Sequence, residues 1–268
     1  AGISTDHECF TLAEGREKIA AGMVVQIREG SAARNFEALH PLISEFPEQV
    51  MLCSDDKHPD DLLAGHINRL AAQAVALGHD RFDVLRCASL NPIRHYRLPV
   101  GTLKPGEPMD AVLFQDLSGF EVVKSFIAGR LVAEEGRCLT SAVSAQPVNR
   151  FHAEPVTSDE LAVDAAGIDS IRVIEAVDGE LVTAERHQSP RVVDGIIEAD
   201  TQRDLLQLAV LNRYQAAPPA TAFVKGFALQ RGAIASTVAH DSHNLIAVGC
   251  SREELVLAIN ALVKSGGG

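Results

Sequence analysis

Two adjacent carboxylates, a lysine and a histidine follow a short apolar run in the stretch 50–61, VMLCSDDKHPDD. The run Val50–Cys53 predicts a buried strand, and Pro59 predicts the start of a helix. Proteins built from alternating strands and helices place their chemistry at the carboxyl ends of parallel strands. Because Asp55 and Asp56 repel each other in a poorly hydrated site, we expect a cation to compensate them, with a metal ion as the first candidate.

Two more predicted strands end in polar residues in the same way. The strand at 1–4 leads into Thr-Asp-His-Glu at 5–8, and the strand at 23–27 leads into Arg-Glu-Gly at 28–30. Histidine and carboxylate ligands suit a divalent metal, which lowers the pKa of bound water from about 16 to about 7. A carboxylate beside that water can take up its proton and deliver it to a leaving group, a double role that suits Asp55. If the three strands are neighbours, one rim gathers His7, Glu8, Glu29, Asp55, Asp56 and His58.

Each of these residues also has a plain structural explanation. The paired aspartates could cap the following helix, and Asp60 and Asp61 suit the dipole of its first turn. His7 could be a surface residue and His58 a loop residue. Spacing alone leaves these alternatives open.

The composition limits the class of protein. The chain has 268 residues, 46% of them hydrophobic, and a net charge of −12, which argues against a nucleic-acid partner. No apolar run approaches the roughly 18 to 20 residues of a membrane span. The five cysteines lack C-x-x-C spacing, which indicates reduced thiols and a cytoplasmic location. Because the chain begins at Ala1 and enters a predicted strand at once, we expect a piece of a longer polypeptide.

Residues 1–99 alternate strands and helices, which predicts an α/β fold with a parallel sheet covered by helices. Thr11 and Glu14 form a capping box at the start of the first helix, which ends at Gly22. Further helices are expected at 33–46, 60–77 and 83–90, the last stopped by Asn91-Pro92. The helix at 60–77 carries one apolar face made of Leu63, Ile67, Leu70, Ala74 and Leu77.

The texture changes after residue 100. Short strands at 113–114, 122–127 and 131–132 predict a small antiparallel subdomain, and 141–149 is expected to be a linker. A second α/β part follows, with a hairpin around a type I′ turn at Asp178-Gly179 and apolar runs at 205–211, 234–238 and 245–248. Ser251 and Glu254 are expected to cap a final helix with the apolar face Leu255, Ile259, Leu262 and Val263.

Several motifs carry a family resemblance. The runs STDHE at 4–8, CSDDKHPDD at 53–61 and AHDSHN at 239–244 resemble the bacterial adenine deaminases, a family of the amidohydrolase superfamily. ASLNP at 88–92, GTLKPG at 101–106 and VKGF at 224–227 add to a similarity that covers essentially the whole chain. The resemblance implies a distorted (β/α)8 barrel, a small β-sandwich subdomain and an extra C-terminal domain. The chain would hold the last three β/α units at 1–99, the sandwich at 100–145 and an incomplete α/β C-terminal domain at 146–268.

The same resemblance implies a reaction and roles for individual residues. The family hydrolyses adenine to hypoxanthine and ammonia in purine salvage, through hydroxide on a binuclear centre of manganese, iron or zinc. By carry-over, His7 is a metal ligand, Asp55 is both a metal ligand and the proton shuttle, and Asp56 binds the purine ring. Glu8 becomes a candidate acid/base, and His243 a candidate substrate contact. The expected assembly is a homo-oligomer.

The sequence also departs from the family pattern. The His-x-His motif after the first barrel strand, the carboxylate after the fourth and the histidine after the fifth are absent from these 268 residues. The resemblance therefore implies that a remaining barrel segment of the same polypeptide supplies them. Two alternatives stay open: another amidohydrolase substrate (a different purine, a cyclic amide or an N-acyl group), or a non-catalytic scaffold with this fold.

Overall fold

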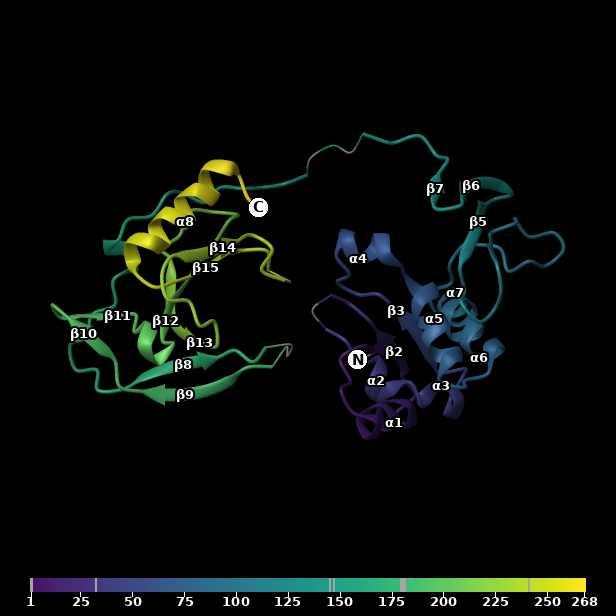
Figure 1. Cartoon of the computed structure of the whole chain (residues 1–268), viewed down its shortest axis with the longest axis horizontal. Helices are drawn as coiled ribbons and strands as arrows, with labels where there is room; N and C mark the ends of the chain where they lie inside the picture. Colours follow the sequence, from purple (N-terminus) through teal and green to yellow (C-terminus); the bar gives the residue numbers. More distant parts are fainter. Residues whose placement is uncertain (1, 32, 145, 147, 179–181, 241) are drawn as a thin grey trace. The chain divides into compact units, whose positions relative to one another are not determined.

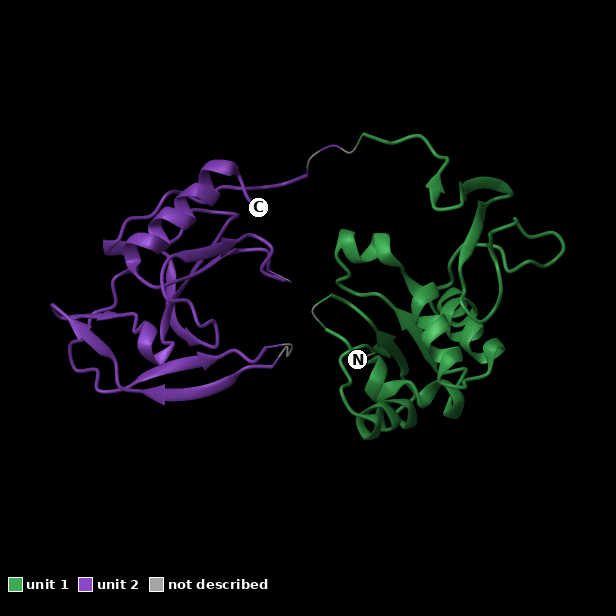
Figure 2. Cartoon of the chain, viewed as in Figure 1, with its two compact units in different colours: residues 1–144 green, residues 145–268 purple. Residues whose placement is uncertain are grey.

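The computed structural model describes residues 2–31, 33–144, 146, 148–178, 182–240 and 242–268. The chain divides into two compact units, Ala1–Ser144 and Ala145–Gly268, which are coloured separately in Figure 2. Within the described residues, no helix has the length and apolar character needed to cross a membrane. The mixture of strands and helices confirms the predicted α/β class.

A three-stranded parallel sheet forms the centre of the first unit (Figure 1). Its strands β1 (Thr5–Asp6), β2 (Val24–Arg28) and β3 (Val50–Cys53) lie in that order, with Arg28 opposite Cys53 at the carboxyl ends. The predicted first strand at 1–4 was placed too early, because only Thr5 and Asp6 pair with β2. Parallel pairing brings the carboxyl ends of all three strands, and the polar residues that follow them, to one edge of the sheet.

Helices cover this sheet and bury its apolar side chains. They are α1 (Leu12–Ala20), α2 (Phe36–Leu39), α3 (Leu42–Glu45), α4 (Pro59–Ala64), α5 (Ile67–Ala76), α6 (Arg81–Leu85), a π-helical turn (Arg86–Leu90) and α7 (Asn91–Tyr96). The predicted cap of α1 is confirmed, since Thr11 Oγ1 accepts a hydrogen bond from Glu14 N at 3.2 Å. Strand residues such as Ile27 and Leu52 pack with Phe36 and Leu70 in one core.

Two predicted long helices are broken in the structure. The helix expected at 33–46 is interrupted between α2 and α3 at Pro41, which has no N–H to donate. The helix expected at 60–77 is interrupted between α4 and α5 at Gly65, whose φ of +156° lies outside the helical range. As a result, the prediction of one continuous apolar face was wrong at its two ends. Leu63 is 92% exposed and Leu77 is 51% exposed.

The helix predicted to stop at Asn91-Pro92 instead continues into α7. Pro92 lies in the first turn of α7, where a missing N–H costs nothing. Asn91 is buried, and its Nδ2 donates to Pro47 O and Val50 O, both at 2.7 Å. The asparagine thereby ties this helix to the start of β3.

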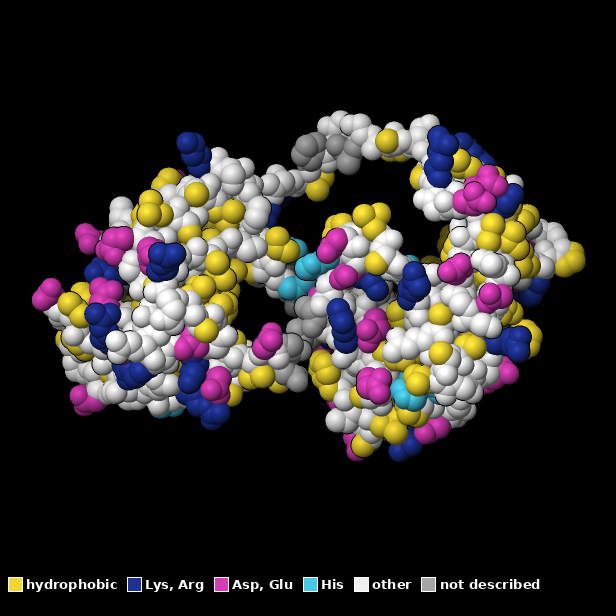
Figure 3. Space-filling view, viewed as in Figure 1, with side chains coloured by type: hydrophobic (Ala, Val, Ile, Leu, Met, Phe, Trp, Pro, Cys, Tyr) yellow, Lys and Arg dark blue, Asp and Glu magenta, His cyan; other side chains and the backbone are white. Residues whose placement is uncertain are grey.

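An antiparallel sheet completes the first unit, as predicted. It consists of β4 (Ala111–Phe114), β5 (Val122–Ile127), β6 (Arg130–Glu134) and β7 (Arg137–Cys138). The turn between β5 and β6 holds Ala128 and Gly129 at positive φ, which is the type I′ geometry of tight hairpins. Apolar side chains are exposed on this sheet, and an apolar cavity of about 670 Å³ lies between it and helices α5 and α7 (Figure 3).

The second unit is built around a six-stranded mixed sheet in the order β14-β15-β12-β13-β8-β9. Its strands are β8 (Ile171–Glu175), β9 (Ala184–Gln188), β12 (Leu206–Leu211), β13 (Ala220–Lys225), β14 (Ala233–Ser236) and β15 (Leu245–Gly249). A separate hairpin of β10 (Arg191–Val193) and β11 (Ile196–Glu198), two 3-10 turns (Asp159–Leu161 and Thr201–Arg203) and helix α8 (Arg252–Ser265) complete it. The final helix is capped as predicted, with Ser251 Oγ accepting from Glu254 N at 3.2 Å.

The predicted hairpin at 171–184 is present as the antiparallel pair β8 and β9. Its second strand begins at Ala184, later than expected, and the predicted turn includes Gly179, which lies outside the described residues. The strands β10, β11 and β13 were not predicted, because their short runs lack a clear alternation of apolar and polar residues.

Candidate active site at the strand ends of the first unit

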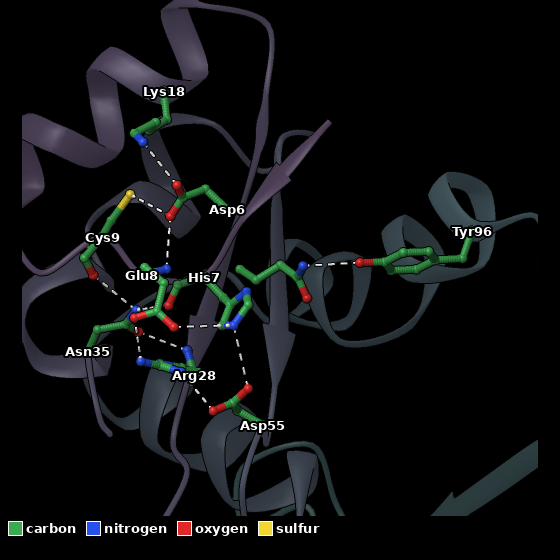
Figure 4. Close-up of polar contacts among 10 residues, drawn as sticks. Asp6, His7, Glu8, Cys9, Lys18, Arg28, Asn35, Asp55 and Tyr96 are labelled. Atoms are coloured by element: carbon green, nitrogen blue, oxygen red, sulfur yellow. Dashed lines mark hydrogen bonds and ion pairs between the residues drawn. The ribbon is translucent and has the colours of Figure 1, made fainter. Parts of the chain in front are cut away.

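Arg28, the last residue of β2, joins two of the predicted site carboxylates (Figure 4). Its Nη1 donates to Asp55 Oδ2 at 2.7 Å, and its Nη2 donates to Glu8 Oε2 at 2.9 Å. Only 3% of the Arg28 side chain is exposed, so the guanidinium donates these charge-assisted hydrogen bonds from a buried position, although the Glu8 side chain is 56% exposed. A guanidinium from the protein therefore compensates Asp55, where the sequence led us to expect a metal ion.

His7 completes this group of side chains. Its Nε2 lies 3.6 Å from Asp55 Oδ1 and 3.4 Å from Glu8 Oε1, on the carboxylate oxygens that Arg28 leaves free. The His7 side chain is 43% exposed and the Asp55 side chain 21%, so the group opens toward solvent. The strand ends thus bring together His7, Glu8 and Asp55, three of the residues predicted from sequence.

A buried asparagine holds the segment that carries His7 and Glu8. Asn35 Nδ2 donates to His7 O at 3.2 Å and Cys9 O at 3.0 Å, while its Oδ1 accepts from Arg28 N at 2.8 Å. Only 2% of Asn35 is exposed. This one side chain fixes the backbone of the first strand end against the second.

Asp6 fixes the same segment from its other side. Its carboxylate accepts from Glu8 N at 2.8 Å, Lys18 Nζ at 3.0 Å and Cys9 Sγ at 3.3 Å. Burial raises the pKa of Asp6, but the hydrogen bonds from Lys18 and Glu8 outweigh it and leave that pKa below its ordinary value. Burial, followed by the neighbouring Asp6, raises the pKa of the Cys9 thiol to about 12, so Cys9 stays protonated.

The carboxylate of Asp56 lies against a glycine. A Cβ on Gly30 would lie 1.8 Å from Asp56 Oδ1, so only glycine leaves room for this carboxylate. Next to it, Ser31 Oγ donates to Asp61 Oδ2 and accepts from His58 N, the latter at 2.9 Å. Asp61 and His58 therefore tie the loop after β3 to the loop after β2, and the contacts of His58 involve its backbone.

Glu29 was predicted on the rim but turns toward the helix that follows it. Its Oε1 accepts a long hydrogen bond of 3.4 Å from Phe36 N, at the start of α2. Burial raises the pKa of the Glu29 carboxyl. We therefore leave Glu29 out of the site.

His243, the candidate substrate contact, belongs to the second unit. Its φ is +51°, its N donates to Ala239 O at 2.6 Å, and its O accepts from Arg213 Nη1 at 3.3 Å. The guanidinium of Arg213 also lies 5.4 Å from the ring centre of Tyr214. These contacts order the local turn and give no further sign of a role.

The first unit offers two ligands that fit a metal ion. Ligand bonds of about 2.0 to 2.2 Å in tetrahedral geometry separate two donor atoms by roughly 3.4 Å, close to the 3.6 Å between His7 Nε2 and Asp55 Oδ1. Among the described residues, no group of three or more His, Cys, Asp or Glu side chains is arranged to hold a metal. The pair therefore fits a metal as part of a ligand set, with the other ligands supplied from elsewhere.

Comparison with known proteins finds two family matches along the chain. Residues 5–132 match the amidohydrolase family. Residues 180–268 match the adenine deaminase C-terminal domain.

Curated relatives are similar to the whole of this chain. Adenine deaminase from Salinibacter ruber is 51% identical, and that from Parabacteroides distasonis 48% identical, over 100% of this chain and 49% of their own lengths. The chain thus spans about half the length of the curated relatives it matches. Among solved structures, β-aspartyl dipeptidase from Fervidobacterium islandicum is 19% identical, with a TM-score of 0.40 over 50% of this chain and 37% of that one.

Proposed function

We propose that this chain forms part of an enzyme that hydrolyses adenine to hypoxanthine and ammonia. The observation that carries the proposal is the convergence of His7 Nε2 and Asp55 Oδ1, 3.6 Å apart, after the two outer strands β1 and β3 of one parallel sheet. The identity of 51% and 48% to curated adenine deaminases supports adenine as the substrate. The chain spans about half of those relatives, so a further segment would complete the site.

We further propose the architecture in which this site works. The sheet β1–β3 would be the last part of a (β/α)8 barrel at 1–99, and β4–β7 would belong to a β-sandwich subdomain at 100–145. Residues 146–268 would form the extra C-terminal domain. The apolar cavity between β4–β7 and the helices would receive part of the remaining polypeptide, because exposed apolar surface of this kind favours burial.

The residues keep the roles implied by the family. His7 and Asp55 would hold a divalent metal, with manganese, iron or zinc in a binuclear centre, and the metal would supply an activated water. Each oxygen of the Asp55 carboxylate has two acceptor positions, so Oδ1 can take up the proton of the attacking water while it faces His7. The reaction then forms a bond between C6 of adenine and the water oxygen, and it breaks the bond between C6 and the amino nitrogen. The proton taken up by Asp55 leaves with the departing amine. Asp56 would hydrogen-bond the purine ring, with Glu8 and His243 as acid/base and substrate contacts.

The cysteines support a reducing compartment. All five are free thiols, and burial raises the pKa values of Cys9, Cys53 and Cys87 to about 12, which keeps them unreactive. We therefore place the enzyme in the cytoplasm. We further propose that it forms a homo-oligomer and that adenine is its small-molecule partner.

Replacing Asp55 by Asn in the natural polypeptide that contains these residues tests the assignment. We expect hypoxanthine production from adenine, measured by chromatography with Mn²⁺ added, to fall by at least about 100-fold, the lower range of effect for a general acid–base group. Asp60→Asn is the matched control, because it makes the same change at an exposed position in the first turn of α4.

Two results would contradict this assignment. If Asp55→Asn kept the activity of the unaltered enzyme, the role of Asp55 would be wrong. If ammonia were released from another purine, a cyclic amide or an N-acyl substrate but not from adenine, the site would serve a different amidohydrolase reaction.

A further inference from the structure

We infer that Arg28 is a positioning residue that decides which oxygen of Asp55, and which oxygen of Glu8, is offered to the metal site. This inference rests on the proposed metal-dependent deamination. Arg28 does not approach the candidate ligand His7 in any hydrogen bond of the described residues, so it would act through the two carboxylates.

The first step is that the Arg28 side chain is fixed. Arg28 pairs with Cys53 in the parallel sheet, and its backbone N donates to Asn35 Oδ1. The Arg28 side chain is 3% exposed. A buried guanidinium is planar and carries its donors in a rigid fork. The guanidinium therefore offers its two donors to the carboxylates from a fixed position.

The second step is that the fork contacts one oxygen of each carboxylate. Asp55 Oδ2 lies 2.7 Å from Nη1, and Glu8 Oε2 lies 2.9 Å from Nη2. The other two oxygens, Asp55 Oδ1 and Glu8 Oε1, both face His7 Nε2, at 3.6 and 3.4 Å. Arg28 thus turns both carboxylates so that their free oxygens converge on the histidine.

The third step concerns the backbone. Asp55 has a φ of +46°, a left-handed conformation that costs free energy for a residue other than glycine. The ion pair with Arg28 compensates this cost and holds Asp55, two positions after the end of β3, in place. Without the guanidinium, Asp55 and Glu8 would repel each other, and either could rotate away from His7.

A lysine cannot replace this function. Its ammonium is a single nitrogen on a flexible stem, whereas the fork reaches two carboxylates with two nitrogens at once. Arg28→Lys should therefore keep the buried positive charge but lose the simultaneous contact. Arg28→Ala should lose both, and added guanidinium should refill part of the space.

The test measures metal binding as well as turnover, using the natural polypeptide that contains these residues. We expect Arg28→Lys and Arg28→Ala to weaken Mn²⁺ binding by about 10- to 100-fold, the range seen for groups that orient metal ligands. We expect kcat for adenine to fall while KM changes little, and millimolar guanidinium to restore part of both losses in Arg28→Ala. The matched control is Arg16→Ala. Arg16 also donates two hydrogen bonds to a carboxylate, that of Glu45, at 2.7 and 2.8 Å, but it lies away from the strand ends.

The outcomes separate this inference from the proposed function. If Mn²⁺ binding depends on Arg28 but adenine is not a substrate, the proposed reaction fails and the positioning role stands. If both Arg28 variants fold, by circular dichroism, and bind Mn²⁺ as the unaltered protein does, the positioning role is wrong. If Arg28→Ala is unfolded, the Mn²⁺ binding of Arg28→Lys alone decides whether the positioning role holds. If the unaltered protein binds no stoichiometric metal, the inference is also wrong.

Discussion

At the scale of single residues, Gly30 limits where Asp56 can lie. A Cβ at position 30 would lie 1.8 Å from Asp56 Oδ1 and 3.1 Å from Ala33 O. The φ of Gly30 is not positive, so space, and not backbone conformation, requires glycine here. Gly30→Ala should therefore push the Asp56 carboxylate out of place and raise KM for adenine by about tenfold or more, because small displacements of a positioned group are costly.

Gly119→Ala provides the control for this prediction. Gly119 also lies beside an aspartate, but its added Cβ would be 3.8 Å from Asp116 Oδ1, an ordinary contact. Steady-state kinetics should show an unchanged KM for this variant. If Gly30→Ala kept the KM of the unaltered enzyme, Asp56 would not be the residue that contacts the purine ring.

The sequence was sufficient to place His7 and Asp55 at the same edge of the sheet, since both belong to polar segments that follow predicted parallel strands. It was not sufficient to identify Arg28 or Asn35. An arginine at a strand end usually lies in solvent, and its burial depends on two carboxylates that are 20 and 27 positions away in the chain. The buried Asn35 is understood only once its three backbone partners are known to meet.

At the scale of elements, a histidine pair joins three helices at the end of the first unit opposite the candidate site. His40 follows α2, Ser44 lies in α3, and His79 follows α5. His79 Nε2 lies 2.9 Å from His40 Nδ1, and its Nδ1 lies 2.7 Å from Ser44 Oγ. Burial, followed by the neighbouring His40, lowers the pKa of His79 below its ordinary 6.5.

This pair predicts a loss of stability at mildly acid pH. The unfolded chain binds a proton on His79 near pH 6.5, whereas the folded chain binds it only at lower pH, so stability falls as the pH drops below 6.5. Asp6 and Glu45, whose pKa values are lowered from 3.8 and 4.5, contribute only at more acid pH. Hydrogen exchange of the α5 amides in urea, at pH 7.5 and 5.5, should show a smaller pH effect in His79→Gln than in the unaltered chain. His187→Gln, in the second unit, should leave the effect in α5 unchanged, and an equal pH effect in all three proteins would contradict the prediction.

The elements also show which local signals are reliable. The strand Val50–Cys53 and the caps at Thr11 and Ser251 were predicted well, because an apolar run and a capping box are recognised from residues close together in the chain. Helix lengths were overestimated at Pro41 and Gly65. Apolar residues continue at the helical spacing of 3.6 across these positions, although the proline and the glycine interrupt the helical backbone. The helix through Asn91-Pro92 was missed because its contacts with Pro47 and Val50 lie more than 40 positions away.

At the scale of the whole molecule, the chain divides at the segment predicted to be a linker. The described residues of 141–149 form no helix or strand, and Val143 and Val148 are 90% and 91% exposed. At the end of this segment, Asn149 Nδ2 donates to Gly266 O at 3.3 Å. The composition of this segment, without apolar periodicity, therefore predicted the boundary between the units.

An exposed, extended segment is the preferred substrate of a protease, because the backbone must enter the protease cleft without unfolding anything else. Brief digestion with elastase, which cuts after small apolar residues, should therefore cleave the chain first near Val143, and mass spectrometry should find two products that meet within 141–149. Val192 is the internal comparison: it is 50% exposed, but it lies in the β10–β11 hairpin and should be cut much later. Replacing Val143 and Val148 by Asp should slow the first cut without changing the far-ultraviolet circular dichroism. If Val192 were cleaved as early as Val143, or if the first cut fell inside a sheet, this segment would not be the most accessible part of the chain.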